Sequence, residues 1–161
     1  MKKLFFRLIG KIYFKIQDIS FESKYLGYRK KYNLSKTFKF NGNEILFYGD
    51  GKIIIGDNTY IGRYSTIQSY SGCVVTIGSN CSISHYVKIY TMNSNAEDII
   101  VEKKEISKSI GDVTIGNNCW IGTNVFIKEG IEIGDNCVIG ANSVVTKNIP
   151  TRSKYVGSKI L

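Results

Sequence analysis

The chain has little of several residue types that mark whole classes of protein. Only one histidine, one tryptophan and one proline occur among its 161 residues. Its four cysteines form no Cys-x-x-Cys pair, which argues against a zinc or redox motif. No run of about eighteen apolar residues is present, so no segment is predicted to cross a membrane. Apolar residues make up 43% of the chain, which predicts a globular domain rather than a disordered tail.

Acidic residues are scarce near the N-terminus. Residues 1–40 hold eleven Lys or Arg and two acids, so they carry the whole net charge of +9, and the rest of the chain is balanced. Basic residues at positions 3, 7, 11 and 15 recur every four residues, which places them along one face of a predicted helix. They interrupt the apolar run and no small-residue cleavage site follows, so this segment is not predicted to be a secretory signal.

Two interpretations of residues 1–16 stay open. A basic amphipathic helix can lie on an anionic membrane surface, which would give peripheral contact at the inner face of the cytoplasmic membrane. Alternatively, the helix packs on the end of the domain and its lysines lie in water. Nucleic-acid binding is not predicted, because the basic segment belongs to no recognisable nucleic-acid-binding module.

A six-residue repeat runs through most of the chain, from residue 53 to residue 149. Ten units begin with Ile at one phase, and Gly follows in seven of them. The fifth position of most units is small or β-branched: Thr59, Ser65, Cys81, Val87, Cys119, Val125, Cys137 and Ser143. This pattern predicts a parallel β-helix, in which three short strands per coil enclose a narrow core and Gly or Asn adopts the positive φ of the corners.

The same phase accounts for the cysteines. Cys81, Cys119 and Cys137 occupy the fifth position of their units, and Cys73 lies in a linker. They are predicted to be small buried apolar groups, and no metal site is expected. Free thiols suit a reducing cytoplasm.

Two interruptions break the repeat, a short one at residues 70–76 and a long loop at residues 92–112. Loops of about twenty residues within a compact domain are usually functional or disordered. We interpret this one as functional, since the flat faces of a β-helix form a cleft for an active site only where a loop projects from them. The predicted organisation is a basic, short helical segment at 1–40, a β-helix at 41–150 and a tail at 151–161.

The segments IGNNCWIGTNVFI (115–127) and IGANSVVTKNIP (139–150) resemble the hexapeptide-repeat acyltransferases, which include galactoside, maltose and xenobiotic acetyltransferases and enzymes that acetylate capsule and O-antigen sugars. The resemblance covers about 100 residues. It implies an all-β, left-handed parallel β-helix and a homotrimer with active sites in the grooves between subunits. It also implies acetyl-CoA as the acetyl donor. The positions that match cofactor-lining residues of the family are Trp120, Gly122, Thr123, Gly140, Ala141, Thr146 and Lys147.

The resemblance also implies a histidine base that takes a proton from the acceptor hydroxyl. Only His85 is available, at the third position of its unit, where the repeat phase predicts a side chain that points outward. In the galactoside and maltose enzymes this histidine comes a few residues after an Ile-Tyr-Thr-like strand. The corresponding place here, after residues 89–91, reads Met-Asn-Ser-Asn. The nearby Asn93, Asn95 and Asp98 are candidates to orient His85 or the acceptor.

Three functions are compatible with these residues. The first is an O-acetyltransferase that acts on a sugar hydroxyl in bacterial surface polysaccharide, with His85 as general base. The second is an N-acetyltransferase for an amino-sugar or antibiotic, because an amine needs less help to attack. The third is a non-catalytic trimeric scaffold that fails to bind acetyl-CoA. A γ-class carbonic anhydrase is excluded, because that site needs three histidines and the chain has one.

Overall fold

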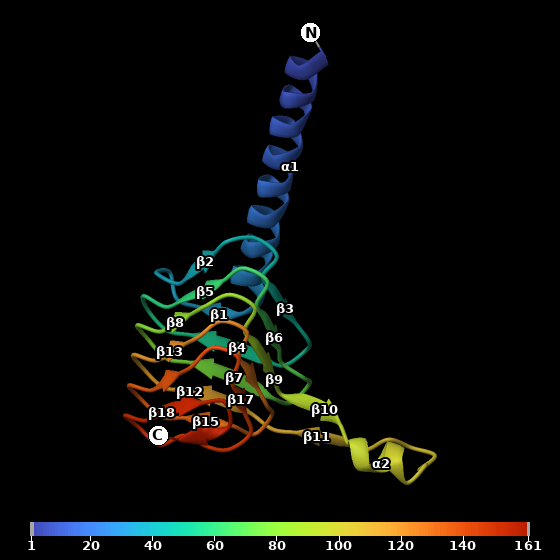
Figure 1. Cartoon of the computed structure of the whole chain (residues 1–161), viewed down its shortest axis with the longest axis vertical. Helices are drawn as coiled ribbons and strands as arrows, with labels where there is room; N and C mark the ends of the chain where they lie inside the picture. The colour runs from blue at the N-terminus through green and yellow to red at the C-terminus, as the bar shows by residue number, and fades with distance from the viewer. Residues whose placement is uncertain (1, 161) are drawn as a thin grey trace. The chain divides into compact units, whose positions relative to one another are not determined.

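The computed structural model describes residues 2–160, which fall into two compact units, a helix over residues 2–31 and a coiled β-domain over residues 32–160 (Figure 1). The β-domain is a left-handed parallel β-helix of about five turns, so the expected fold class is confirmed. Met1 and Leu161, the outermost residues of the expected N-terminal segment and tail, lie outside the described residues.

The first unit is one helix, α1 (Lys2–Lys31), which lies within the segment 1–40 that the sequence indicated as helical. None of its residues is buried, and its first turn holds no acid while its last turn holds Arg29, Lys30 and Lys31. Basic side chains at a helix C-terminus interact favourably with the partial negative charge there. The apolar side chains of α1 that are largely exposed are Leu4, Phe5, Phe6, Leu8, Ile9, Ile12, Tyr13, Phe14, Ile16, Ile19 and Leu26.

Three sheets form the walls of the β-domain, and their strands are parallel except for a final hairpin. Sheet A contains β1 (Asn33–Leu34), β4 (Lys52–Ile55), β7 (Val74–Ile77), β12 (Val113–Ile115) and β15 (Glu132–Ile133). Sheet B contains β2 (Lys39–Asn41), β5 (Tyr60–Gly62), β8 (Ser82–Ile83), β13 (Trp120–Ile121), β16 (Val138–Ile139), β18 (Lys154–Val156) and β19 (Lys159–Ile160). Sheet C contains β3 (Leu46–Tyr48), β6 (Thr66–Gln68), β9 (Lys88–Tyr90), β14 (Phe126–Ile127) and β17 (Val144–Val145).

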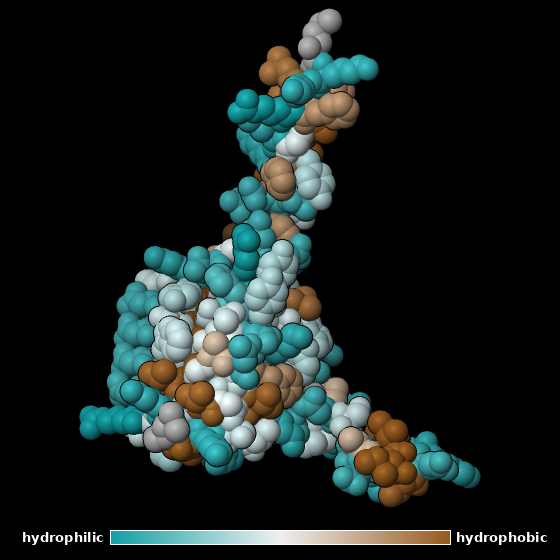
Figure 2. Space-filling view, viewed as in Figure 1, coloured by the Kyte–Doolittle hydropathy of each residue, from teal (hydrophilic) through white to brown (hydrophobic). Residues whose placement is uncertain are grey.

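The long loop forms an arm that projects from the coil (Figure 1). Its two strands, β10 (Met92–Ser94) and β11 (Lys108–Ile110), pair antiparallel, and a short helix, α2 (Ala96–Ile100), lies near its tip. Apolar side chains gather at this tip, where Ile99, Ile100 and Val101 are largely exposed (Figure 2).

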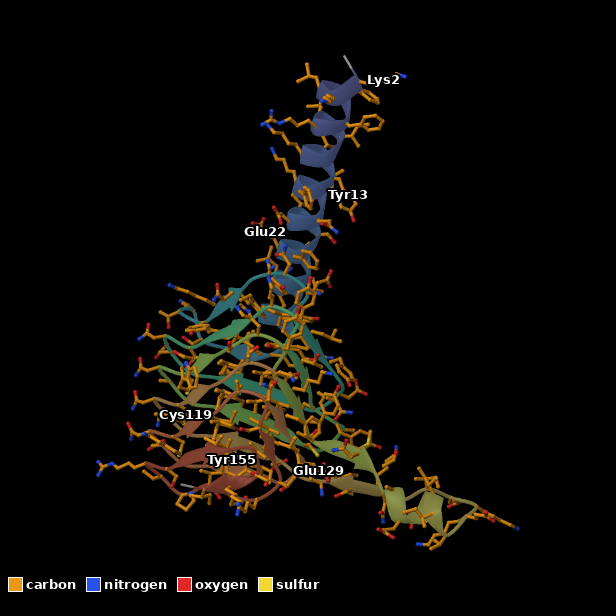
Figure 3. The ribbon with its side chains drawn as sticks, in the orientation of Figure 1. Lys2, Tyr13, Glu22, Cys119, Glu129 and Tyr155 are labelled. Atoms are coloured by element: carbon orange, nitrogen blue, oxygen red, sulfur yellow. The ribbon has the colours of Figure 1, made fainter. Side chains whose placement is uncertain are left out.

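The core consists of columns of identical or similar residues, one from each turn. In sheet B the register aligns Ile61 with Ile83, Ile83 with Ile121, and Ile121 with Ile139. These four side chains are fully buried, and the register aligns Ile139 with Tyr155 of β18, which is labelled in Figure 3. Because each isoleucine packs on the one above and below it, the repeat in the sequence becomes a continuous apolar column.

The cysteines lie inside the coil as expected. All four are free and buried. The Sγ atoms of Cys81, Cys119 and Cys137 lie 3.1–3.2 Å from carbonyl oxygens of the next turn, so each thiol has a hydrogen-bond acceptor. Burial raises the pKa of the Cys137 thiol, which keeps it protonated.

Three corners join the sheets, and we name each by the sheets that it connects. Corner AB comprises residues 35–38, 56–59, 78–81, 116–119, 134–137 and 150–153. Corner BC comprises residues 42–45, 63–65, 84–87, 122–125 and 140–143. Corner CA comprises residues 49–51, 69–73, 91–112, 128–131 and 146–148, and therefore includes the arm.

The boundaries of the β-domain differ from those expected. The first strand begins at Asn33, within the segment assigned to the basic N-terminal region, and Tyr32 and Phe38 are already buried. The C-terminal tail adds β18 to sheet B rather than trailing from it. Residues 32–48 lack the Ile-Gly repeat because aromatic side chains such as Phe38 and Phe47 fill the core at this end of the coil.

Candidate active site

The imidazole of His85 lies at corner BC, between β8 and β9, and is exposed. Its Nδ1 accepts a hydrogen bond of 3.1 Å from the backbone N–H of Arg63 in the preceding turn. Gly62 leaves room for this contact, since a Cβ added there would lie 2.6 Å from Nδ1. Because Nδ1 is an acceptor, the neutral ring carries its proton on Nε2 and presents a hydrogen-bond donor there.

Five of the seven residues expected to line the cofactor lie at or beside the same corner. Trp120 is on β13 and 47% exposed, while Thr123 and Ala141 are exposed at corner BC. The hydroxyl of Thr123 donates a 3.0 Å hydrogen bond to the backbone carbonyl oxygen of His85, so an expected cofactor residue contacts the backbone of the residue that carries the expected base.

The two glycines of this group, Gly122 and Gly140, have their own role in the coil. A Cβ on Gly122 would lie 2.5 Å from the backbone nitrogen of Ala141, a distance that real side chains do not reach. Gly122 is therefore required by the close stacking of adjacent turns, whatever binds outside. Gly140 is less constrained, because its nearest neighbour would be a methyl group of Val156 at 3.2 Å.

Thr146 and Lys147 are not part of this group. They follow β17 and are exposed at corner CA, so sheet C separates them from Trp120 and Thr123. The arm also leaves from corner CA, whereas His85 lies at corner BC with β9 between them. A single chain therefore divides the expected active-site residues between two edges of the prism.

The base of the arm holds a buried carboxylate that the sequence did not single out. Glu129 is 6% exposed, accepts a hydrogen bond from the side-chain amide of Asn93, and has Oε1 3.2 Å from Nζ of Lys128 (Figure 3). Burial by itself raises the pKa of Glu129, but hydrogen bonds from Ser109 and Asn93 outweigh it and hold the pKa below its usual value. The ionised carboxylate fixes both strands of the arm to the next turn. In the sequence, the one feature that could have drawn attention to Glu129 is its position before Gly130 in the IKEG unit.

Asn93 therefore lies at the root of the arm, whereas Asn95 and Asp98 lie near its tip. Asn95 caps α2, its side chain accepting a 3.2 Å hydrogen bond from the N–H of Glu97. Asp98 is buried, pairs with Lys103 and accepts a 2.8 Å hydrogen bond from the N–H of Ser107. Lys103 and Ser107 hold the pKa of Asp98 at about 2. Both side chains are engaged within the arm, so the structure gives them a local folding role where the sequence suggested contact with an acceptor.

Corner BC also carries two exposed tyrosines with unusual backbone geometry. Tyr64 and Tyr86 have φ values of 60° and 59°, at positions where later turns have Asn124 and Asn142. A bulky residue in this region costs about 1–3 kcal/mol. The two rings stack with centroids 4.9 Å apart and planes inclined by 11°. Such a pair contributes about 0.5–1.5 kcal/mol. Stacking does not offset the strain of both residues.

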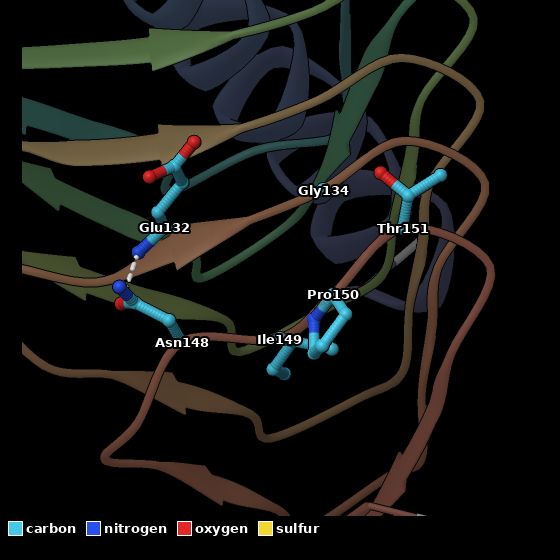
Figure 4. Close-up of a pocket in the computed structure, with 6 residues that line it drawn as sticks. All are labelled: Glu132, Gly134, Asn148, Ile149, Pro150 and Thr151. Carbon is cyan, nitrogen blue, oxygen red and sulfur yellow. Dashed lines mark hydrogen bonds between the residues drawn. The ribbon is translucent and has the colours of Figure 1, made fainter.

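A shallow pocket of about 280 Å³ lies at the C-terminal end of the coil, between corners CA and AB. It is lined by Glu132, Gly134, Asn148, Ile149, Pro150 and Thr151 (Figure 4). The side-chain carbonyl of Asn148 accepts a 2.9 Å hydrogen bond from the N–H of Glu132, which closes the last turn of sheet A. None of the expected catalytic or cofactor residues lines this pocket.

Metal-binding and membrane-spanning features are both missing from the described residues. Within residues 2–160, no group of three or more His, Cys, Asp or Glu side chains is placed to hold a metal ion. Neither helix in the described part of the chain combines the length and apolar character needed to cross a membrane.

Comparison with known proteins gives two matches to family models. Residues 112–147 match the model of bacterial transferase hexapeptide (six repeats), and residues 52–84 match that of the hexapeptide repeat of succinyl-transferase. Polysialic acid O-acetyltransferase from Escherichia coli O1:K1 / APEC is 38% identical over 125 residues. That alignment covers 78% of this chain and 40% of the relative, so the chain spans about two fifths of the relative's length.

Solved structures agree. A maltose O-acetyltransferase from Clostridium difficile 630 is 32% identical with a TM-score of 0.57, over 78% of this chain and 70% of that one. A galactoside acetyltransferase in complex with coenzyme A is 30% identical with a TM-score of 0.66, over 80% of this chain and 63% of that one. With the repeat, the coil and these relatives in agreement, the chain belongs to the hexapeptide-repeat acyltransferase family.

Proposed function

We propose that the protein is an acetyl-CoA-dependent O-acetyltransferase that transfers an acetyl group to a hydroxyl of a sugar in bacterial surface polysaccharide. The observation that carries this proposal is the hydrogen bond from Thr123 to the backbone carbonyl of His85 at corner BC, in which the residue that bears the one imidazole of the sequence contacts an expected cofactor residue. The similarity to polysialic acid O-acetyltransferase supports a glycan acceptor.

In this reaction His85 removes the proton from an acceptor hydroxyl, whose oxygen attacks the thioester carbonyl of acetyl-CoA. The coenzyme A thiolate leaves and takes up the proton from the imidazole. Trp120 offers an exposed aromatic face to the pantetheine arm, and Thr123 and Ala141 line its path along the corner. Backbone N–H groups stabilise the negative charge that develops on the carbonyl oxygen.

The hydrogen bond from Arg63 to Nδ1 places a requirement on this mechanism. For Nε2 to accept a proton, the proton of the neutral ring must move to Nδ1, and the bond with the Arg63 N–H must break. Loss of one such bond costs about 1 kcal/mol. That cost is small beside the 10²–10⁴-fold acceleration that a positioned base typically provides.

The same hydrogen bond favours a second candidate, an N-acetyltransferase for an amino-sugar or an antibiotic. An amine attacks a thioester without a base of this kind, and Nε2–H of His85 would then act as a hydrogen-bond donor. A third candidate is a trimeric scaffold without catalysis, which would not bind acetyl-CoA.

We further propose a homotrimer. The division of the expected site between corners BC and CA is resolved if corner CA of one copy faces corner BC of the next. Lys147, Asn93 and the arm of one subunit would then lie opposite His85 and Trp120 of its neighbour. The groove between two copies would then contain all the expected active-site residues, some from one subunit and the rest from the other.

Trp120→Ala is expected to weaken acetyl-CoA binding at least about tenfold in calorimetry, a loss of about 1.4 kcal/mol, because it removes the exposed aromatic face. Wild-type protein should bind about one acetyl-CoA per chain, and light scattering of the same sample should give three times the chain mass of 18.1 kDa. Leu46→Ala, an exposed residue on β3 at the other end of the coil, is the control. Absence of binding by the wild type up to millimolar acetyl-CoA would favour the scaffold.

We also propose that α1 lies on the anionic inner face of the cytoplasmic membrane and that the protein acts in the cytoplasm. Residues 2–16 hold five bases and no acid, beside the exposed apolar side chains of the same turns. Each basic residue near such a surface contributes on the order of 1 kcal/mol. The protein should sediment with phosphatidylglycerol vesicles, and the variant with Lys3, Arg7, Lys11 and Lys15 changed to Gln should not. Equal sedimentation of both proteins with phosphatidylglycerol vesicles, or no sedimentation of the wild type with them, would contradict this.

A further inference from the structure

Four residues at corner BC form one surface, and the proposed reaction gives a side-chain role to only one of them, His85. We name it the tyrosine shelf and define it as Arg63, Tyr64, His85 and Tyr86. The two rings stack on the outside of the coil, 44% and 49% exposed, so neither contributes to the core. The guanidinium of Arg63 lies 6.0 Å from the centroid of the Tyr64 ring.

Fold stability does not account for these residues. Both tyrosines adopt positive φ, and in the turns that follow the same position is Asn124 or Asn142, which tolerate that conformation. Asparagine would satisfy the corner, since the side chains of Asn124 and Asn142 bond each other at 2.9 Å. Residues with a strained backbone that add nothing to the stability of the fold are concentrated at ligand sites. The tyrosines are therefore candidates for binding.

The chemistry of the shelf suits a sugar that carries negative charge. The C–H face of a pyranose ring is apolar and packs on an aromatic face, while its hydroxyl and carboxylate groups need donors at the edge. Arg63 provides a guanidinium for a sugar carboxylate, and Nε2 of His85 is left for the reacting hydroxyl because Nδ1 is bonded to the N–H of Arg63. Residues 60–66 and 82–88 hold no acid, and Glu44 is the one acidic residue in the preceding turn of corner BC.

Position along the corner separates this surface from the cofactor path. The carbonyl oxygen of His85 accepts hydrogen bonds from Thr123 Oγ1 and from the N–H of Asn124, both at 3.0 Å, so the shelf directly precedes the expected cofactor residues. An acceptor must approach the thioester from the side that the cofactor leaves free. With acetyl-CoA along residues 120–141, that side is the one occupied by Tyr64 and Tyr86.

We propose that the tyrosine shelf is the binding site for the sugar rings of an anionic glycan acceptor, with Tyr64 and Tyr86 as stacking surfaces and Arg63 as the partner of the sugar carboxylate. This assignment rests on the proposed function, because it places the acceptor relative to acetyl-CoA. It names a substrate class and three residues beyond those of the transfer reaction.

The test uses the full chain and the double variant Tyr64→Asn/Tyr86→Asn, which removes both rings but keeps a residue suited to positive φ. Calorimetry measures the binding of oligosialic acid, oligogalacturonic acid and neutral maltohexaose, and separately of acetyl-CoA. The double variant should lose at least about tenfold in affinity for the acidic oligosaccharide that binds best. Its acetyl-CoA affinity and melting temperature should be unchanged, or the melting temperature higher because strain is removed.

Two further variants sharpen the result. Arg63→Gln should weaken the binding of the acidic oligosaccharides and leave the binding of maltohexaose unaffected. Trp120→Ala should show the reverse of the double variant, with weaker binding of acetyl-CoA and unchanged binding of the glycan. Unchanged glycan affinity in the double variant would overturn the proposal, as would binding of acetyl-CoA but of neither acidic oligosaccharide by the wild type. Loss of acetyl-CoA affinity in the double variant would also overturn it and assign the shelf to the nucleotide instead. Failure of the wild type to bind acetyl-CoA would count against the proposed function itself.

Discussion

His85→Ala is expected to lower turnover with a hydroxyl acceptor by about 10²–10⁴-fold, because it removes the positioned base. Acetyl-CoA affinity should change little, since Thr123 bonds the backbone carbonyl of residue 85 and not its side chain. The imidazole is exposed, so the melting temperature should also be retained. The measurement is thiol release in steady state with saturating acetyl-CoA, over a panel of sugar acceptors.

The acceptor panel distinguishes the two enzymatic candidates. If transfer to hydroxyls is lost and transfer to an amino-sugar persists, the protein is an N-acetyltransferase in which His85 has no essential role as a base. A His85→Gln control keeps a hydrogen-bond donor near the position of Nε2–H, so its rescue of activity would show that donation matters rather than proton removal. Transfer to a hydroxyl at the wild-type rate by His85→Ala would refute the assignment of the base.

Ile121→Ala is expected to lower the free energy of unfolding by about 2–5 kcal/mol, because it opens a cavity in the isoleucine column of sheet B. Ile121 is fully buried and aligned between Ile83 and Ile139, and the flat strands of adjacent turns cannot close the gap without breaking their hydrogen bonds. The corresponding drop in melting temperature is roughly 4–20 °C. Differential scanning calorimetry at fixed protein concentration measures it.

Strand β17 offers a matched control for this prediction. Val145 is fully buried and Val144, its neighbour on the same strand, is 48% exposed. Val145→Ala should destabilise the protein clearly, whereas Val144→Ala should stay within about 0.5 kcal/mol of the wild type. Similar losses for both valines would mean that the strand responds to β-propensity and not to packing in the core.

The repeat made the coil predictable from the sequence. Each turn needs a branched apolar residue inside and a residue that accepts positive φ at the corner, so a short pattern is repeated with little freedom. The repeat phase alone therefore places Ile121 and Cys119 in the core, and both are buried. The start of the coil could not be placed in this way, because Phe38 and Phe47 fill the first turn in place of isoleucine.

The candidate site was predictable only in part. The outward direction of His85 followed from the repeat phase. Its contact with Thr123 did not, since 38 residues and the whole arm separate them in the chain. The separation of Lys147 from Trp120 could have been read from the repeat, since no interruption lies between them and each six-residue unit advances the chain by one sheet. The burial of Asp98 was not predictable either, because it depends on how the arm folds around that carboxylate.

The sequence by itself determined the coil, the residues inside it and the family, because period and side-chain size act locally and repeat in every turn. Tertiary structure alone decided which corner each polar side chain occupies, that Glu129 is buried beneath the arm, and that Arg63 holds Nδ1 of His85. These features depend on contacts between residues in different turns, whose alignment is set by backbone hydrogen bonds along the coil and not by neighbours in the chain.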